Sequence, residues 1–215
     1  MTRRDLVTGV SAIAIAAAGS GAFALPVRAQ AAATVPPAEL AQAGPLGDRA
    51  IGAENAPITI IEYASMTCPH CAHFSAETFP KLKERYIDTG KVRFIFREFP
   101  LDALAAGASM LARCADNDKY FPLVELLFST QNQWAVQKPL DPLFKVVKQA
   151  GFTEDTFKSC LANQKLLDGI QAVRDRAANQ LGVSSTPTFF INGKRVAGAL
   201  SIEEMEKELE PYLKA

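Results

Sequence analysis

Two cysteines separated by two residues, Cys68-Pro69-His70-Cys71, are the part of the sequence best suited to chemistry. The β-branched segment Ile58–Ala64 precedes them and predicts a buried strand, and the residues that follow predict a helix over 68–88. Proline is favoured at the first helical position, so Cys68 is expected at the N-cap, facing free backbone N–H groups and the positive end of the helix dipole. This placement stabilises the thiolate and therefore lowers the pKa of Cys68.

The spacing of the two cysteines predicts a different role for each. Cys68 is expected to be the attacking thiol that forms a mixed disulfide, and Cys71, one turn along and less exposed, is expected to resolve it. His70, when protonated or donating an N–H, is predicted to stabilise the Cys68 thiolate further. Because a stabilised thiolate favours the reduced form, the disulfide between the two is expected to be an oxidant.

Other uses of a Cys-x-x-Cys pair agree less well with the sequence. A structural zinc site takes four ligands, usually as two close pairs, whereas Cys114 and Cys160 are isolated. Haem attachment requires a histidine directly after the second cysteine, and residue 72 is alanine. A purely structural bridge over so small a loop would add little stability. We therefore expect no metal, nucleotide or haem, and no cofactor beyond the redox-active Cys68–Cys71 disulfide.

Composition narrows the possible classes of protein. The chain has 215 residues, of which 48% are hydrophobic, a size that suits one domain or one domain with an insertion. Lys+Arg and Asp+Glu both number 23, and no basic run occurs, so nucleic acid is not an expected partner.

Residues 1–29 have the composition of an export signal. Arg3-Arg4 precedes a weakly apolar, charge-free run from Leu6 to Val27, and small residues at Val27 and Ala29 suit a signal peptidase. The paired arginines favour a twin-arginine signal. A general secretory signal and an uncleaved membrane anchor are the alternatives. Export predicts a periplasmic location, where disulfides form and persist.

The rest of the chain predicts an α/β domain over 47–215. Residues 30–46 are rich in Ala, Pro and Gly and predict a flexible linker. A second strand is expected over 92–99, a hairpin around Asn192-Gly193, and a final helix beginning near Ile202. Between the second strand and the hairpin, helices are expected over 101–116, 120–129, 142–150, 153–162 and 166–181. A strand–helix–strand crossover needs only about a dozen residues, so a helical insertion is predicted over about 101–165.

The combined pattern resembles the DsbA family of thioredoxin-fold disulfide oxidoreductases, over roughly 47–215. It consists of Cys-Pro-His-Cys after a strand, a helical insertion, and Thr186-Pro187 before another strand. The resemblance implies a thioredoxin fold, a central sheet flanked by helices. It also implies that Pro187 is a cis-proline facing Cys68 and that Thr186 pairs with an extended substrate. Alone, Pro187 would be an ordinary proline at the start of a strand.

The resemblance also suggests roles for three further residues. Glu62, six residues before Cys68, matches a buried acid that would accept or relay the proton of Cys71; the alternative is a polar residue at a strand edge. Cys114 and Cys160 match a second, non-catalytic disulfide, with two buried free thiols as the alternative. His73 is expected to be a surface residue.

We therefore expect an exported, monomeric thiol:disulfide oxidoreductase that passes its disulfide to cysteine pairs of newly exported proteins. A DsbB-like membrane quinone reductase would reoxidise it. The alternative is an isomerase or reductase of the DsbC/DsbG type, because Thr186 precedes the proline where many DsbA oxidases have valine. The short 30–46 segment argues against the N-terminal dimerisation domain of those proteins. A non-catalytic binding module is a third possibility, but binding alone would not require the cysteines.

Overall fold

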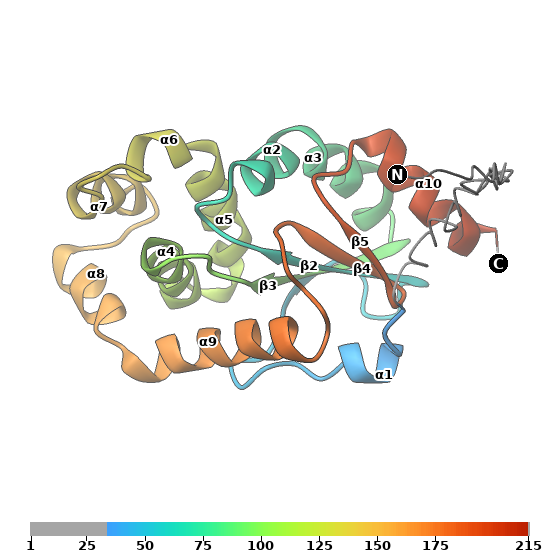
Figure 1. Cartoon of the computed structure of the whole chain (residues 1–215). Helices are drawn as coiled ribbons and strands as arrows, with labels where there is room; N and C mark the ends of the chain where they lie inside the picture. The colour runs from blue at the N-terminus through green and yellow to red at the C-terminus, as the bar shows by residue number, and fades with distance from the viewer. Residues whose placement is uncertain (1–33, 215) are drawn as a thin grey trace, which may run out of the picture. The chain divides into compact units, whose positions relative to one another are not determined.

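The computed structural model describes residues 34–214, so the predicted export signal lies outside the described residues. A five-stranded sheet with the order β1-β3-β2-β4-β5 forms its centre (Figure 1). The strands are β1 (Arg49–Ile51), β2 (Ile58–Ala64), β3 (Val92–Glu98), β4 (Thr188–Ile191) and β5 (Lys194–Ala197). Only β2 and β3 are parallel, and the other neighbouring pairs are antiparallel. The parallel pair requires a crossover, and that crossover carries the Cys-x-x-Cys segment.

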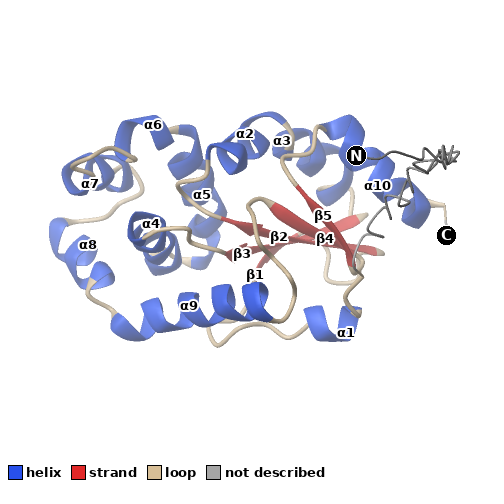
Figure 2. Ribbon diagram, viewed as in Figure 1, coloured by secondary structure: helices blue, strands red, loops and turns tan. Residues whose placement is uncertain are grey.

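Helices cover both faces of the sheet, as Figure 2 shows. One face is covered by α2 (Pro69–Glu77), α3 (Phe79–Leu82) and α10 (Ile202–Leu213), and the other by α9 (Gln164–Asn179) and α1 (Pro37–Leu40). Successive side chains of a strand point to opposite faces. In β2, Ile60 accordingly packs in the core under α2, and Ile61 packs in the core under α9. Both central strands are therefore buried along nearly their whole length.

The crossover from β2 to β3 begins with α2 and changes helical geometry twice. The helix is interrupted at Thr78, two residues before Pro80, whose missing N–H cannot continue the hydrogen-bond ladder. A π-helical turn, Lys83–Ile87, follows α3, and Gly90, with a φ of 75°, ends the crossover. The helix predicted over 68–88 is thus interrupted at Thr78, whose hydroxyl donates to the Leu200 carbonyl at 2.7 Å.

The helical insertion lies beside the end of the sheet that carries the start of α2 (Figure 1). It contains α4 (Ala103–Cys114), α5 (Tyr120–Ser129), α6 (Gln131–Trp134), α7 (Leu140–Lys148) and α8 (Glu154–Leu161). Asp102 caps α4 by accepting the Ala105 N–H at 2.7 Å, and a capping box at Thr153 begins α8. The insertion brings α5 and α6 to α2, so it supplies one wall of the region around Cys68.

The described part of the predicted linker is packed, which differs from the expected flexible lead-in. It forms the short helix α1, in which Leu40 is buried. Buried Arg97 donates to the Leu40 carbonyl at 2.8 Å and forms a two-contact ion pair with Asp48. The guanidinium needs these acceptors because a buried charge must be paired. Among residues 34–214, no helix is both long enough and apolar enough to cross a membrane.

Candidate active site

The candidate active site lies where β2 ends and α2 begins. Cys68 is the N-cap of α2, with extended backbone angles, and Pro69 occupies the first helical turn. The Cys68 N–H donates to the Ser65 carbonyl at 3.0 Å, and its carbonyl accepts the Ala72 N–H at 3.1 Å. Only 6% of Cys68 is exposed, whereas Pro69 and His70 lie at the surface. The local sequence therefore places one sulfur at the open end of a helix.

The loop before β4 faces this sulfur. The Thr186–Pro187 peptide bond is cis, and the Cys68 thiol donates to the Thr186 carbonyl with an Sγ–O distance of 3.3 Å. The Thr186 hydroxyl is buried and has no hydrogen-bond partner among the described residues. It is therefore free to donate to the Cys68 sulfur once that sulfur is a thiolate.

The two free cysteines differ strongly in acidity. The pKa of Cys68 is lowered to about 5, chiefly by the hydrogen bond from the Cys71 thiol, against the opposing effect of partial burial. The Thr186 side chain and the backbone N–H groups of Cys71 and His70 lower it further, because each can donate to the thiolate. His70 is exposed and contributes through its backbone N–H; the role expected of its imidazole stays a prediction. Burial raises the pKa of Cys71 far above its ordinary value, so Cys71 stays protonated beside an ionised Cys68.

Glu62 is a buried acid whose charge interacts with both cysteines. It is 3% exposed, so it is not the edge residue that the alternative interpretation required. Burial, and then the charge of Cys68, raises its pKa to about 8. The charge of Glu62 in turn helps to raise the pKa of Cys71. At neutral pH the site therefore holds an ionised thiol, a neutral thiol and a neutral carboxylic acid.

Three other residues named from the sequence lie outside this site. Cys114 and Cys160 are joined in a disulfide that ties α4 to α8, with a Cα–Cα distance of 6.2 Å. His73 is exposed. Across residues 34–214, no group of three or more His, Cys, Asp or Glu side chains is placed to hold a metal ion.

Contacts from the helical insertion support the site and were not found from the sequence. Gln131, in α6, donates to the carbonyl oxygens of Met66 and Cys68 at 2.8 and 3.1 Å. Asp102 accepts the Thr67 hydroxyl at 2.6 Å. An aspartate before an Ala-rich helical segment could have indicated the N-cap of α4. Nothing local could have indicated that Gln131 reaches the Cys68 loop.

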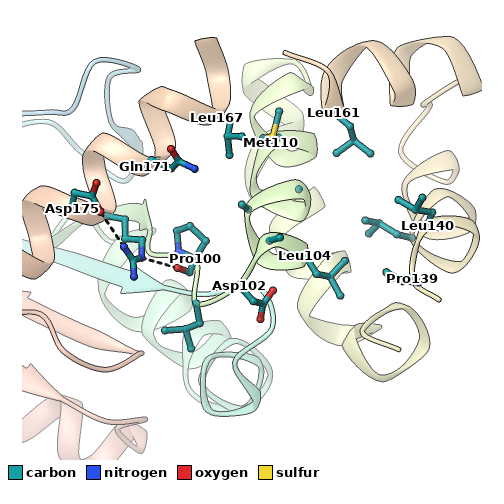
Figure 3. A pocket seen from close by; sticks show the side chains of 16 residues that line it. Pro100, Asp102, Leu104, Met110, Pro139, Leu140, Leu161, Leu167, Gln171 and Asp175 are labelled. Carbon is teal, nitrogen blue, oxygen red and sulfur yellow. Dashed lines mark hydrogen bonds and ion pairs between the residues drawn. The ribbon is translucent and has the colours of Figure 1, made fainter. Parts of the chain in front are cut away.

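An apolar groove of about 850 Å³ begins at Asp102, next to the Thr67 contact. Figure 3 shows side chains of the insertion and of α9 arranged around it. Its apolar lining includes Leu101, Leu104, Met110, Leu140, Leu143, Leu161 and Leu167. Leu101 and Leu140 are more than half exposed. The Thr67–Asp102 hydrogen bond links this groove to the segment that carries Cys68.

Comparison with known proteins identifies the family. The chain belongs to the family described as Thioredoxin, which matches residues 46–211. More particularly, it is similar to Wolbachia pipientis alpha-DsbA1, with 34% identity and a TM-score of 0.76 over 82% of this chain and 96% of that chain. The predicted thioredoxin fold and the resemblance to DsbA are therefore confirmed.

Curated relatives carry related names. The chain is 28% identical to Disulfide bond formation protein D of Bacillus subtilis over 177 residues, 78% of each chain. It is 34% identical over 148 residues to a Rickettsia bellii protein provisionally named a protein-disulfide oxidoreductase, covering 68% of this chain and 57% of that protein. The chain spans about three fifths of the length of the Rickettsia relatives that it matches.

Proposed function

We propose that this chain is an exported, periplasmic thiol:disulfide oxidoreductase that donates a Cys68–Cys71 disulfide to cysteine pairs of newly exported proteins. The observation that carries the proposal is the pairing of unlike thiols, with Cys68 at a pKa of about 5 and Cys71 buried and protonated. A thiolate this stable favours the reduced pair, so the disulfide is expected to be an oxidant. Electrons pass only between sulfur atoms, and the proposal includes no metal, nucleotide or haem.

The reaction takes place in two exchange steps. A substrate thiolate attacks Cys68 Sγ, a new S–S bond forms, and the Cys68–Cys71 bond breaks. The departing Cys71 sulfur takes a proton from Glu62, which is protonated at neutral pH. A second substrate thiolate then attacks the substrate sulfur of the mixed disulfide and expels Cys68 as a stable thiolate. The substrate is oxidised by two electrons, and the cysteine pair is reduced by two.

Substrate binding is proposed at two surfaces beside the sulfur. The backbone at Thr186 offers an edge on which an extended segment can pair as a strand adds to a sheet. An unfolded substrate also exposes apolar side chains, and the groove that begins at Asp102, the partner of the Thr67 hydroxyl, gives them an apolar surface. The protein would act as a monomer, and a DsbB-like membrane quinone reductase would restore its disulfide.

One observation favours a second candidate, an isomerase or reductase of the DsbC/DsbG type. The residue before the cis-proline is Thr186, whereas many DsbA oxidases have valine there. The two candidates differ in the direction of electron flow. The redox state of the pair in the cell therefore distinguishes them.

The experiment measures that redox state in the native host. Cells are quenched in acid and free thiols are alkylated. Mass spectrometry of the peptides then scores Cys68 and Cys71 separately from Cys114 and Cys160. We expect a mostly oxidised pair; a mostly reduced pair would favour the isomerase or reductase. Purified oxidised protein should also convert a reduced dithiol peptide to its disulfide, and a Cys68→Ser variant should not.

A further inference from the structure

Residues 65–68 form the turn between β2 and α2, and the last of them carries the attacking sulfur. Within this turn, the Cys68 N–H donates to the Ser65 carbonyl at 3.0 Å. Met66 is fully buried, so its carbonyl oxygen needs a donor from inside the protein. The position of the Cys68 sulfur therefore depends on what holds this short turn from outside.

The side-chain amide of Gln131 holds the turn at two points. Its Nε2 atom donates to the Met66 carbonyl at 2.8 Å and to the Cys68 carbonyl at 3.1 Å. An amide nitrogen has two N–H groups, so one side chain can make both bonds. Among residues 34–214, this amide is the one donor to the Met66 carbonyl. A single residue of the helical insertion thus joins the middle of the turn to the N-cap of α2.

The corner between α5 and α6 fixes Gln131, which is the first residue of α6. Before it, the Thr130 hydroxyl donates to the Leu126 carbonyl at 2.6 Å. After it, the indole N–H of the fully buried Trp134 donates to the Leu127 carbonyl at 2.8 Å. Both acceptors belong to α5, which packs on α2. Because the chain is anchored on both sides of Gln131, its amide is preorganised toward the turn.

We propose that Gln131 is a positioning residue for the exchange reaction, and that it keeps the Cys68 sulfur facing the open end of α2. The inference rests on the proposed function. The backbone N–H groups of His70 and Cys71 stabilise a thiolate only while the sulfur lies in front of them. A turn released from Gln131 is free to carry the sulfur away from these groups. Gln131 acts through two carbonyl groups of the backbone, so it is not a catalytic residue.

The charged groups around Cys68 are held independently of this contact. Two titratable groups interact with Cys68, namely Cys71 on α2 and Glu62 on β2. Asp102, from the start of the insertion, bonds to a hydroxyl of the turn at 2.6 Å. None of these groups has a hydrogen bond to Gln131 in the described part of the chain. A change in the acidity of Cys68 on replacing Gln131 would therefore report a change in the turn.

The test compares Gln131→Met with a matched control, Gln133→Met. Methionine has nearly the length of glutamine but cannot donate, and Gln133 is an exposed residue of the same helix. Reduced protein is alkylated over a range of pH, and mass spectrometry of the peptides gives the midpoint for Cys68. We expect this midpoint to rise by about one pH unit in Gln131→Met and to match the wild type in Gln133→Met. A wild-type midpoint in Gln131→Met would overturn the proposal, whatever the stability of the variant.

A second pair of variants, Gln131→Glu and Gln133→Glu, gives the same test with a polar side chain if Gln131→Met does not fold. A carboxylate has nearly the shape of the amide but only accepts hydrogen bonds, so it cannot hold either carbonyl. It also adds a negative charge beside the turn, so we expect Gln131→Glu to raise the Cys68 midpoint by more than about one pH unit. Gln133→Glu adds the same charge at an exposed position and should have little effect. Equal midpoints in this pair would overturn the proposal.

The equilibrium with glutathione measures the consequence for the reaction. A tenfold loss of thiolate stability makes the Cys68–Cys71 disulfide a weaker oxidant by the same factor. The equilibrium constant for oxidation of glutathione at pH 7 should therefore fall about tenfold in Gln131→Met and stay unchanged in Gln133→Met. An unchanged constant in Gln131→Met would overturn the proposal. A wild type that transfers no disulfide to a reduced dithiol peptide would instead overturn the proposed function, and the alkylation midpoints would still test the role of Gln131.

Discussion

Glu62 and Glu98 are two buried carboxyl groups on the adjacent parallel strands β2 and β3, and they have opposite surroundings. Glu62 is opposite Phe96 in the register, and Phe96 and Glu98 are two residues apart, so both acids point to the same face. Glu98 accepts two hydrogen bonds from Arg113, at 2.6 and 2.9 Å, and a third from the Tyr120 hydroxyl at 2.6 Å. Glu62 has an oxygen with no partner among the described residues.

On one face of the sheet, the same type of side chain therefore serves stability at one position and chemistry at another. A carboxylate with a cation and a hydroxyl as partners is held in place by charge-assisted hydrogen bonds. A carboxyl group without such partners is neutral until the pH approaches its raised pKa, so it can give and take a proton. Pairing therefore fits Glu98 for structure, and the absence of pairing fits Glu62 for proton transfer.

Removing the carboxylate of Glu98 should have the largest effect on folding. Glu98→Gln leaves the Arg113 guanidinium buried without its counterion, and breaking a buried pair typically costs about 3–5 kcal/mol. We expect a loss of this size in the free energy of unfolding, measured by urea denaturation of the oxidised protein. The pH midpoint for alkylation of Cys68 should stay unchanged.

The double variant Glu98→Gln/Arg113→Met is the matched control. Removing the second charge removes the uncompensated cation, so the double variant should recover at least half of the stability lost in Glu98→Gln. Recovery will be incomplete, because Arg113 also donates to the Leu46 and Gly47 carbonyls. If the losses of stability from the two substitutions simply add in the double variant, the ion pair is not the source of the loss in Glu98→Gln.

Replacing Glu62 should change the pH dependence of stability in the reduced protein. The folded pKa of Glu62 is raised to about 8, so its contribution is full below its ordinary value and is lost as the pH rises towards 8. The folded pKa of Cys68 is lowered to about 5, so its contribution grows as the pH rises above 5. Between about pH 5 and 8, the contributions of Glu62 and Cys68 to the free energy of unfolding therefore change in opposite directions.

Glu62→Gln removes one of these opposing terms. Unfolding of the reduced wild type should therefore be nearly independent of pH in this range. The free energy of unfolding of reduced Glu62→Gln should instead rise by about 1–3 kcal/mol from pH 5 to 8. Urea titrations at several pH values measure both curves. A Cys68→Ser variant should show the reverse slope, and parallel curves for all three proteins would contradict the pKa assignments.

The sequence could predict the parts of this site that depend on neighbouring residues. The strand Ile58–Ala64 has the predicted bounds, and proline after Cys68 indicated the N-cap. The resemblance to DsbA added Glu62 and the Thr186-Pro187 loop. The structure brings these residues to one place because a strand, a helix start and a loop all meet at the same end of the sheet.

The partners of buried charges could not be predicted in this way. The segment 92–99 alternates aromatic and charged residues, which is typical of a strand with one exposed face, yet Arg97 and Glu98 are both buried. Helices pack on both faces of β3, and the counterions, Asp48 and Arg113, come from other segments of the chain. Such pairing depends on long-range contacts that local periodicity does not contain.

Short elements were missed for a related reason. β1 has three half-buried residues, Arg49–Ile51, which are too few to show alternation. α6 has four residues, and its Gln131 supports the Cys68 loop only through the tertiary fold. These elements are stabilised by what they contact and have little propensity of their own.

The smallest expected effect is also the one that separates the roles of Glu62 and Cys68. Cys68 titrates near pH 5, where Glu62, with a pKa of about 8, is still neutral. Glutamine in place of a neutral acid should therefore leave the midpoint for alkylation of Cys68 within about half a pH unit of the wild type. Glu98→Gln should leave it equally unchanged, because the pKa of Cys68 is set by Cys71, Thr186 and the start of α2. A shift larger than one unit in Glu62→Gln alone would mean that Glu62 is ionised at lower pH and acts on the attacking thiol. No shift, together with slower formation of the mixed disulfide, would place the action of Glu62 on Cys71.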